Sequence, residues 1–240
     1  MIDLYASTTP NVLKIMIMLE ETEFPYSVKP VNVWKGEQFA DDFVQLNPNS
    51  KVPVIVDLDH ADGPYAVFES AAILLYLAEK ADRFLPASGR DRYDVIQWLV
   101  FQAANFGPIQ GQFNHFESYS GQRNDYAHSR YLTELKRQYG VLEARLGRAP
   151  FLGGAEYSIA DMATFPWVLV QSRRLGGAYP FLDRNAPFHP NIAAWMNRCE
   201  ERPGLQRGLV AHAAVKSGLP TATPDDLDRI FGRGNYAYRT

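Results

Sequence analysis

Residues 49–80, NSKVPVIVDLDHADGPYAVFESAAILLYLAEK, restrict the fold more than any other part of the chain. Two short runs rich in β-branched and aromatic residues, VPVIVD and YAVF, flank the turn-forming sequence HADGP. An apolar helical pattern follows directly. The stretch therefore predicts strand, turn, strand and helix, with a Val-Pro dipeptide opening the first strand and a Glu-Ser dipeptide where the second strand meets the helix.

Val52 and Pro53 form the first of these dipeptides. A cis peptide bond has a low cost only before proline, and a cis bond here would turn the backbone N–H and C=O of Val52 away from the sheet. Both groups could then pair with an extended peptide in the manner of an added strand. The alternative is that Pro53 only marks a strand edge.

Glu69 and Ser70 form the second dipeptide. Unpaired N–H groups at a helix start favour a carboxylate, and Glu69 beside them could hold an ammonium. The alternative is that Ser70 only caps the helix. Together the two dipeptides predict a site for a peptide with a free α-amino acid at one end and a backbone amide further along, a description that glutathione fits.

The remaining segments predict two domains. Before residue 49 we expect a strand (IDLY), a polar loop (ASTTPN), a helix over residues 12–22, an edge strand containing Pro30 and a short helix over residues 37–46. The order over residues 1–81 is then βαβαββα. Residues 82–89 read as a linker. Residues 90–215 read as all-helical, with one long helix kinked or ended at Gly107-Pro108 and another begun by a capping box, Ser158-Ile-Ala-Asp161. Residues 216–240 read as an extended tail.

Composition excludes several classes of protein. The net charge is −3, the pI is about 6.0 and no long basic run occurs, so neither nucleic acid nor a membrane surface is expected as a partner. No apolar run approaches the roughly 20 residues of a membrane span. The single cysteine, Cys199, allows no internal disulfide and fits a cytoplasmic protein. The histidines show no ligand spacing, so no metal site is expected.

Several motifs together resemble the glutathione S-transferases, and within them the nu class of bacterial enzymes: TPN followed by Lys14, KGEQF, NSKVP, FESAAILLYLAEK and GPIQGQ. The resemblance covers about residues 1–210. It implies an α/β, thioredoxin-like N-terminal domain, an all-α C-terminal domain and a homodimer. The implied function is that of a glutathione-dependent enzyme which reduces disulfides or peroxides, or conjugates electrophiles, with disulfide reduction favoured in the nu class.

The resemblance also assigns roles to residues. Thr9 and Asn11 take the catalytic place that tyrosine, serine or cysteine has in many transferases, and Tyr5 is expected to face the core instead. A free thiol has a pKa of about 8.5, and lowering it by two units requires about 2.7 kcal/mol of preferential anion stabilisation, which donors at a helix start could supply. The alternative is that Asn11 only caps the helix. The implied glutathione ligands are Gln38, Lys51, Val52, Pro53, Glu69, Ser70 and, from a partner subunit, Arg130.

Three questions stay open. Arg130 could instead lie on a solvated helix face. Aromatic residues of the second domain could wall the second-substrate site or belong to the core: Phe106, Phe113, His115, Phe116, Tyr119 and Trp167. Finally, a transferase-fold binding or regulatory protein with little catalysis would keep the same glutathione contacts.

Overall fold

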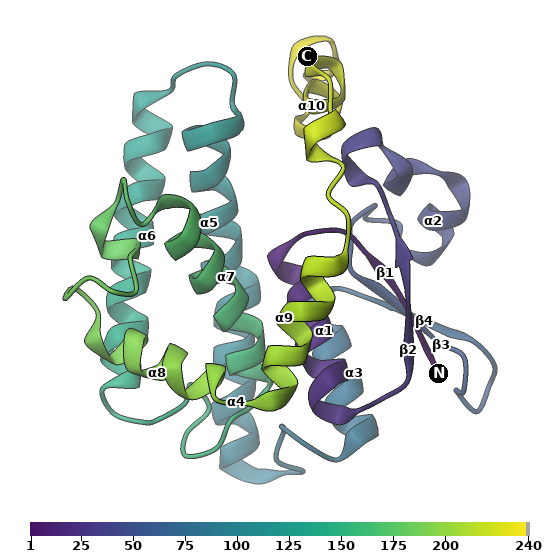
Figure 1. The fold of residues 1–240 in the computed structure, drawn as a ribbon, viewed down its shortest axis with the longest axis vertical. Coiled ribbons are helices and arrows are strands. Elements are labelled where there is room, and N and C mark those ends of the chain that lie inside the picture. Colours follow the sequence, from purple (N-terminus) through teal and green to yellow (C-terminus); the bar gives the residue numbers. More distant parts are fainter. Residues whose placement is uncertain (239–240) are drawn as a thin grey trace.

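A four-stranded sheet forms the core of the N-terminal part of the chain in the computed structural model, which describes residues 1–238 (Figure 1). The strand order is β2-β1-β3-β4, with β1 parallel to β2 and antiparallel to β3, and β4 antiparallel to β3. Pro30 ends β2 at the sheet edge, where a missing N–H removes no ladder bond, as predicted. The strands and helices of this part are β1 (Ile2–Ala6), α1 (Pro10–Thr22), β2 (Tyr26–Pro30), the 3₁₀ turns η1 (Val33–Lys35) and η2 (Glu37–Phe39), α2 (Asp41–Leu46), β3 (Val54–Asp57), β4 (Tyr65–Phe68) and α3 (Ser70–Ala81). The predicted order βαβαββα is confirmed.

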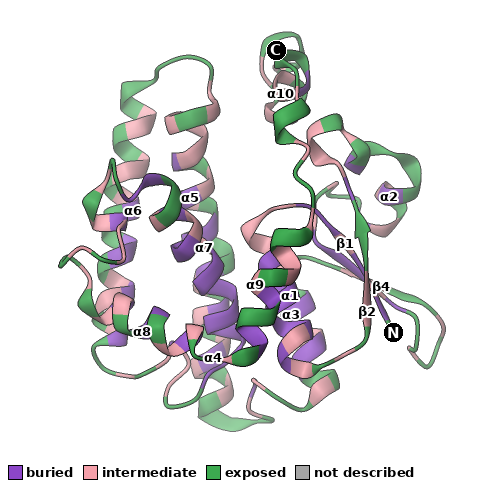
Figure 2. Ribbon diagram, viewed as in Figure 1, coloured by how far each residue is buried: buried purple, intermediate pink, exposed green. Residues whose placement is uncertain are grey.

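Helix α1 lies at the junction of the two domains. It packs against α3 on one side and against α7 and α9 of the helical domain on the other, and its apolar residues share one core with those of β1 and β3. Its residues from Val12 to Leu19 are all buried, which explains why the apolar pattern continues around the whole helix (Figure 2). The start of α1 is therefore held rigidly between the two domains.

The second domain is all-helical, as predicted. Its elements are α4 (Gly89–Phe101), η3 (Gln102–Phe106), α5 (Gly107–Asn114), η4 (His115–Tyr119), α6 (Asp125–Leu146), α7 (Ile159–Leu175), η5 (Pro180–Leu182), α8 (Pro190–Glu200) and α9 (Pro203–Ala214). The alternative that the helix ends at Gly107-Pro108 is wrong. The chain stays helical through a wider π turn, η3, and Pro108 falls in the first turn of α5, where its missing N–H costs least.

The capping box at the start of α7 is confirmed. The Ser158 hydroxyl accepts from the Ala160 N–H at 3.3 Å, and the Asp161 carboxylate accepts from the Ser158 N–H at 3.0 Å. Asp161 also accepts from the Leu152 N–H at 2.9 Å and the Trp195 indole at 2.8 Å. This buried carboxylate therefore joins α7, α8 and the preceding loop.

The expectation of an extended tail is wrong for residues 224–231, which form helix α10 (Pro224–Phe231), between short turns η6 (Leu219–Thr221) and η7 (Gly234–Tyr236). Thr223 and Asp226 form a second capping box, with Pro224 at the first helical position. The last two residues of the predicted tail, 239–240, lie outside the described residues. Among residues 1–238, no helix is long and apolar enough to cross a membrane.

Candidate functional site

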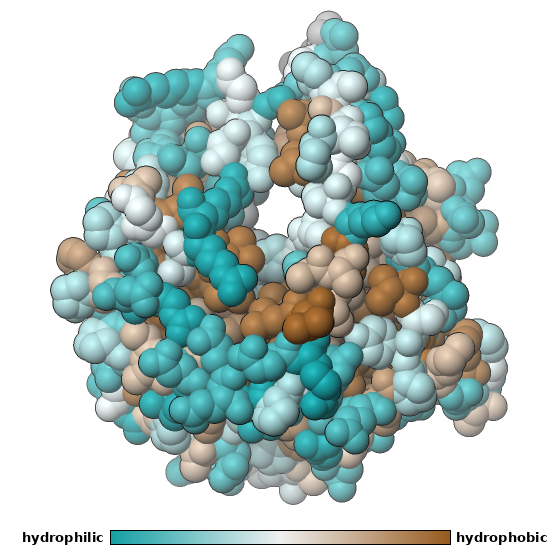
Figure 3. All heavy atoms as spheres, viewed as in Figure 1, coloured by the Kyte–Doolittle hydropathy of each residue, from teal (hydrophilic) through white to brown (hydrophobic). Residues whose placement is uncertain are grey.

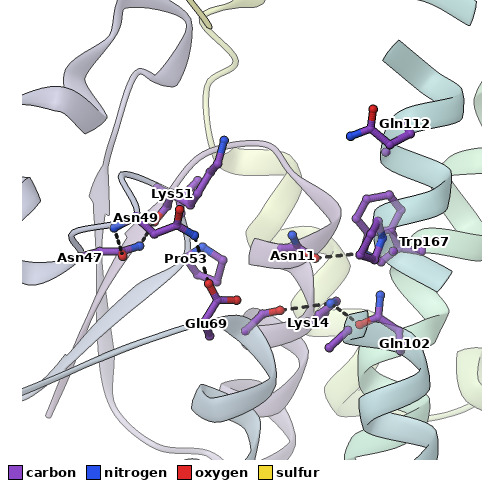
Figure 4. A pocket seen from close by; sticks show the side chains of 16 residues that line it. Asn11, Lys14, Asn47, Asn49, Lys51, Pro53, Glu69, Gln102, Gln112 and Trp167 are labelled. Atoms are coloured by element: carbon purple, nitrogen blue, oxygen red, sulfur yellow. Dashed lines mark hydrogen bonds between the residues drawn. The ribbon is translucent and has the colours of Figure 1, made fainter. Parts of the chain in front are cut away.

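A pocket of about 340 Å³ lies between the two domains, beside the start of α1. The N-terminal domain contributes the start of α1, the loop before β3 and the start of α3, while the helical domain contributes the π turn, α5 and one side chain of α7 (Figure 4). Six of the predicted site residues line it: Asn11, Lys51, Val52, Pro53, Glu69 and Ser70. Segments far apart in the sequence thus meet at one place, as the two dipeptide motifs predict.

The loop before β3 forms one wall. The Val52-Pro53 peptide bond is cis, as predicted, and the ladder of β3 begins at Val54, so Val52 lies outside it. Asn47 is buried and fixes this loop, because its amide donates to the Lys51 carbonyl at 2.7 Å and its oxygen accepts from the Asn49 N–H at 2.9 Å. The loop therefore presents the Val52 backbone and an exposed Lys51 side chain to the pocket.

Glu69 and Ser70 form the adjoining corner of the pocket, beside the loop before β3 (Figure 4). Glu69 has φ +65° and ψ 115°, a conformation that non-glycine residues rarely adopt, and its carboxylate accepts from the Asn49 amide at 3.2 Å. Such strained backbone is concentrated at functional sites. Ser70 is the first helical residue and makes no capping bond, so the alternative that it only caps α3 is wrong. Its hydroxyl instead accepts from the buried Lys14 ammonium at 3.1 Å.

Lys14 lies in the floor of the pocket and is 2% exposed. Its ammonium also donates to Gln102 Oε1, on the π turn of the helical domain, at 2.6 Å. Burial lowers the pKa of Lys14 to about 7, and the nearby negative charge of Glu69 opposes this shift. A lysine that changes charge near neutral pH therefore lies directly behind the Ser70 hydroxyl.

The start of α1 carries the two predicted catalytic residues. Thr9 is the N-cap, with its hydroxyl accepting from the Val12 N–H at 3.2 Å, so the alternative that Asn11 caps the helix is wrong. Asn11 Oδ1 instead accepts from the Trp167 indole of α7 at 2.9 Å (Figure 4). Because an indole N–H only donates, the oxygen of Asn11 faces Trp167, and its NH₂ group is free to donate elsewhere.

Three predicted residues lie apart from the pocket lining. Thr9 is adjacent to it through the cap of α1. Gln38 is buried in η2, and its Oε1 has no hydrogen-bond partner among the described residues. Arg130 is exposed on α6, with its guanidinium 3.8 Å from the Glu134 carboxylate, so its expected contact across a dimer stays a prediction. Tyr5 packs against Phe43, away from the pocket, as expected.

The aromatic candidates for a second-substrate wall divide into three groups. Phe106 and Phe113 are completely buried in the core, whereas Trp167 lines the pocket. His115, Phe116 and Tyr119 are half-buried on η4, outside the pocket lining. Cys199 is also buried, which raises the pKa of its thiol well above the usual range. The chain therefore offers no accessible thiolate of its own at the site.

The tail joins the two domains beyond the pocket. Phe231 of α10 packs against Trp34 of the N-terminal domain and stacks on Tyr119 of the helical domain, with ring centroids 6.4 and 5.0 Å apart. Lys35 also forms an ion pair with Asp226 at 2.6 Å. The space-filling view shows an opening between the domains with the tail above it (Figure 3). The tail is therefore a bridge across the upper end of the interdomain gap.

Five polar residues line the pocket without a role predicted from the sequence: Lys14, Asn47, Asn49, Gln102 and Gln112. Of these residues, Lys14 carried the clearest sequence signal of a special role. It interrupts the apolar run VLKIMIM in a helix that is buried all round, and a charge in such a place calls for a specific partner. Asn47 and Asn49 belong to an Asn-Pro-Asn sequence that is typical of a turn. No residue pattern near Gln102 indicates that its side chain contacts Lys14.

Comparisons with known proteins agree with this geometry. The chain matches the family models for the glutathione S-transferase N-terminal domain over residues 2–79 and the C-terminal domain over residues 104–203. It is 42% identical to the disulfide-bond oxidoreductase YfcG of Escherichia coli over 88% of this chain and 95% of that protein. It is 38% identical to the disulfide-bond oxidoreductase YghU of the same organism, over 88% of this chain and 75% of that protein.

Solved structures show the same fold with glutathione in place. A glutathione transferase family member from Pseudomonas fluorescens, with two glutathione bound, has a TM-score of 0.78 at 37% identity over 87% of this chain and 92% of that one. A glutathione transferase from Pseudomonas putida, with one glutathione disulfide per subunit, has a TM-score of 0.79 at 36% identity over 87% and 90%. With both family models matched over most of its length, this chain belongs to the glutathione S-transferase family.

Proposed function

We propose that the chain is a glutathione-dependent enzyme that activates the glutathione thiol at the start of α1 and uses the thiolate to reduce small disulfides. One observation carries this proposal. A single pocket holds donors at a helix start, the Val52 backbone outside the ladder of β3 and a corner for an amino-acid head group. These three features match the thiol, the backbone and the γ-glutamyl end of glutathione.

Each pocket residue then has a role in the proposal. The Val52 backbone pairs with the ligand backbone, Ser70 and the start of α3 hold the γ-glutamyl carboxylate, and Glu69 holds its ammonium. Lys51 faces the glycine carboxylate. Asn11, together with the Thr9 hydroxyl at the cap, stabilises the thiolate.

The chemistry follows from the absence of an accessible thiol among the described residues. The glutathione thiolate attacks one sulfur of the substrate disulfide, forming a mixed disulfide and releasing the other sulfur as a thiolate. A second glutathione thiolate attacks the glutathione sulfur of that mixed disulfide, releasing the second substrate thiol and leaving glutathione disulfide. Two glutathione molecules are thereby oxidised for each disulfide reduced. Relatives bound to two glutathiones or to glutathione disulfide support a pocket of this capacity.

Three further assignments belong to the same proposal. The chain acts as a nu-class homodimer in which Arg130 reaches the glutathione of the partner subunit, and it works in the cytoplasm. The exposed position of Arg130 on α6 is compatible with such a contact. A cross-linking or scattering measurement of the oligomeric state, with Arg130→Ala tested for glutathione affinity, addresses the dimer contact.

A second candidate function is glutathione binding without efficient catalysis. Ure2p, solved in complex with glutathione, has a TM-score of 0.77 to this structure at 28% identity. Both functions require the same Val52 and Ser70 contacts. Turnover measurements therefore have to separate them.

The deciding experiment measures binding and turnover on one preparation. Calorimetry with reduced and oxidised glutathione tests the site. Assays with 2-hydroxyethyl disulfide and with chlorodinitrobenzene, each with glutathione, then compare disulfide reduction with conjugation. Reduction faster than conjugation supports the proposal, binding without turnover favours the second candidate, and the absence of any glutathione binding refutes both.

A further inference from the structure

Lys14 occupies a position that ordinary core packing does not explain. Its ammonium is buried below the pocket, on the second turn of α1, and touches Ser70 Oγ and Gln102 Oε1, which belong to different domains (Figure 4). Both partners are neutral, and the nearest opposite charge is Glu69 at the end of β4. A buried charge is costly unless it is paired, so this arrangement needs a compensating partner.

The contacts of Lys14 with Ser70 and Gln102 determine where the Ser70 hydroxyl and the Gln102 NH₂ group can donate. A lysine ammonium has three donors and no acceptor, so Ser70 Oγ and Gln102 Oε1 must both accept from it. The Ser70 hydroxyl proton and the Gln102 NH₂ group are then turned to other partners. Gln102 Nε2 is buried and has no partner among the described residues. It lies against Gly107, where a Cβ would be only 2.8 Å away, and both residues line the pocket.

We propose that Lys14 is a positioning residue for the carboxylate at the γ-glutamyl end of the ligand, because it turns the Ser70 and Gln102 donors toward that carboxylate and places a positive charge behind them. The inference rests on the proposed function, since it takes glutathione as the ligand. The ligand carboxylate is the compensating partner that the buried ammonium needs. The π turn η3, which carries Gln102, brings the helical domain into the same contact.

A consequence is that ligand binding and protonation of Lys14 favour each other. Burial lowers the pKa of Lys14 to about 7, so a large share of the unliganded protein holds a neutral amine at pH 8. A carboxylate above Ser70 raises this pKa, and the protein then takes up a proton from solvent. Above pH 7 the affinity should therefore fall as the pH rises.

The other charged and titratable groups around Lys14 come from several elements. Glu69 raises the pKa of Lys14, and Lys51 lies across the pocket. His212 of α9 contacts the Thr9 carbonyl at 3.1 Å, and burial lowers its pKa, so it is neutral at pH 8. Further along α1, Glu20 and Glu21 are paired with arginines of α9 and of the turn before it. Because the α-amino group of the ligand also titrates near pH 8, the uptake that belongs to Lys14 is the part that is lost in Lys14→Met.

Calorimetry with S-methylglutathione tests the linkage, because this ligand has no thiol that could release a proton. Titrations at pH 8 in phosphate and in Tris, whose ionisation enthalpies differ, give the number of protons taken up. We expect the wild type to take up protons on binding and Lys14→Met to take up fewer. Lys51→Met should bind the ligand more weakly but take up as many protons as the wild type. The Lys51 variant is the matched control, since it also removes one pocket ammonium.

A double-mutant cycle tests whether Lys14 acts through Ser70. We expect Lys14→Met to weaken S-methylglutathione binding about 10- to 100-fold in the wild type, since a hydrogen bond to a charged group is lost. The factor should be smaller in Ser70→Ala, where only the Gln102 contact and the charge of Lys14 remain to be lost. Equal effects in both backgrounds would overturn the inference. Thermal unfolding of each variant accompanies the binding data.

If Lys14→Met does not fold, the wild type is titrated with the deamino analogue of S-methylglutathione, which keeps the carboxylate of the γ-glutamyl end but has no amino group that titrates near pH 8. Proton uptake at pH 8 with this analogue, together with an affinity that weakens between pH 7 and pH 9, supports the inference. Binding of the analogue without uptake and with a constant affinity overturns it and leaves the proposed function intact. No binding of glutathione or S-methylglutathione at any pH refutes the proposed function itself.

Discussion

Replacement of Thr9 by alanine should separate a structural role from a chemical one. Thr9 Oγ1 accepts a hydrogen bond from the Val12 N–H at 3.2 Å, which leaves the hydroxyl proton free to be donated to a thiolate. The alanine variant loses both interactions. Thr9→Ser is the matched control, because serine keeps an N-cap oxygen and a hydroxyl proton.

The two losses have different magnitudes. Removing an N-cap costs about 1 kcal/mol of folding free energy, which lowers the Tm by about 2–4 °C in a protein of this size. Removing a hydrogen bond to an anion costs about 1.5–3 kcal/mol, and about 1.4 kcal/mol corresponds to one pKa unit. The thiol pKa of bound glutathione should therefore rise by one to two units in Thr9→Ala.

The assay is the pH dependence of kcat/KM with a small disulfide, together with the ultraviolet absorbance of the bound thiolate. Because a raised thiol pKa reduces the thiolate fraction, the activity at pH 7 should fall about 10- to 100-fold. The difference from the wild type should disappear above the pKa of the variant. A lowered Tm with unchanged kcat/KM at pH 7 would show that Thr9 only caps α1 and would refute the catalytic assignment.

Three other variants test particular contacts. Trp167→Phe removes the donor that orients Asn11, so kcat/KM should fall about three- to tenfold while glutathione affinity stays constant; unchanged kcat/KM would show that this orientation does not limit the rate. Asp161→Ala leaves several buried donors unpaired and should lower the free energy of unfolding by about 3–5 kcal/mol in denaturant titrations, and a loss below about 1 kcal/mol would contradict the network described. Phe231→Ala removes the ring that packs on Trp34, so limited proteolysis should cut residues 216–238 faster than in the wild type, and equal rates would show that the tail is held by other contacts.

Local sequence signals were sufficient for most of the fold. Pro30 predicted an edge strand, the Val-Pro dipeptide predicted a cis bond, and Ser158 with Asp161 predicted the start of α7, because each signal depends on residues within one turn or strand. The tail helix carried an equally local signal in Thr223-Pro-Asp-Asp226. The high Pro and Gly content of the surrounding tail favours an extended chain, and so this local signal was outweighed in the prediction.

By itself, the sequence determined the order of the elements, the family resemblance and six of the residues that line the pocket. Only the tertiary structure decided the direction of their donors. Lys14 meets Gln102 across 88 positions of sequence, and Asn11 meets Trp167 across 156. Such contacts depend on how the helical domain packs against α1, and no local pattern encodes which atom of an amide or hydroxyl will face a distant partner.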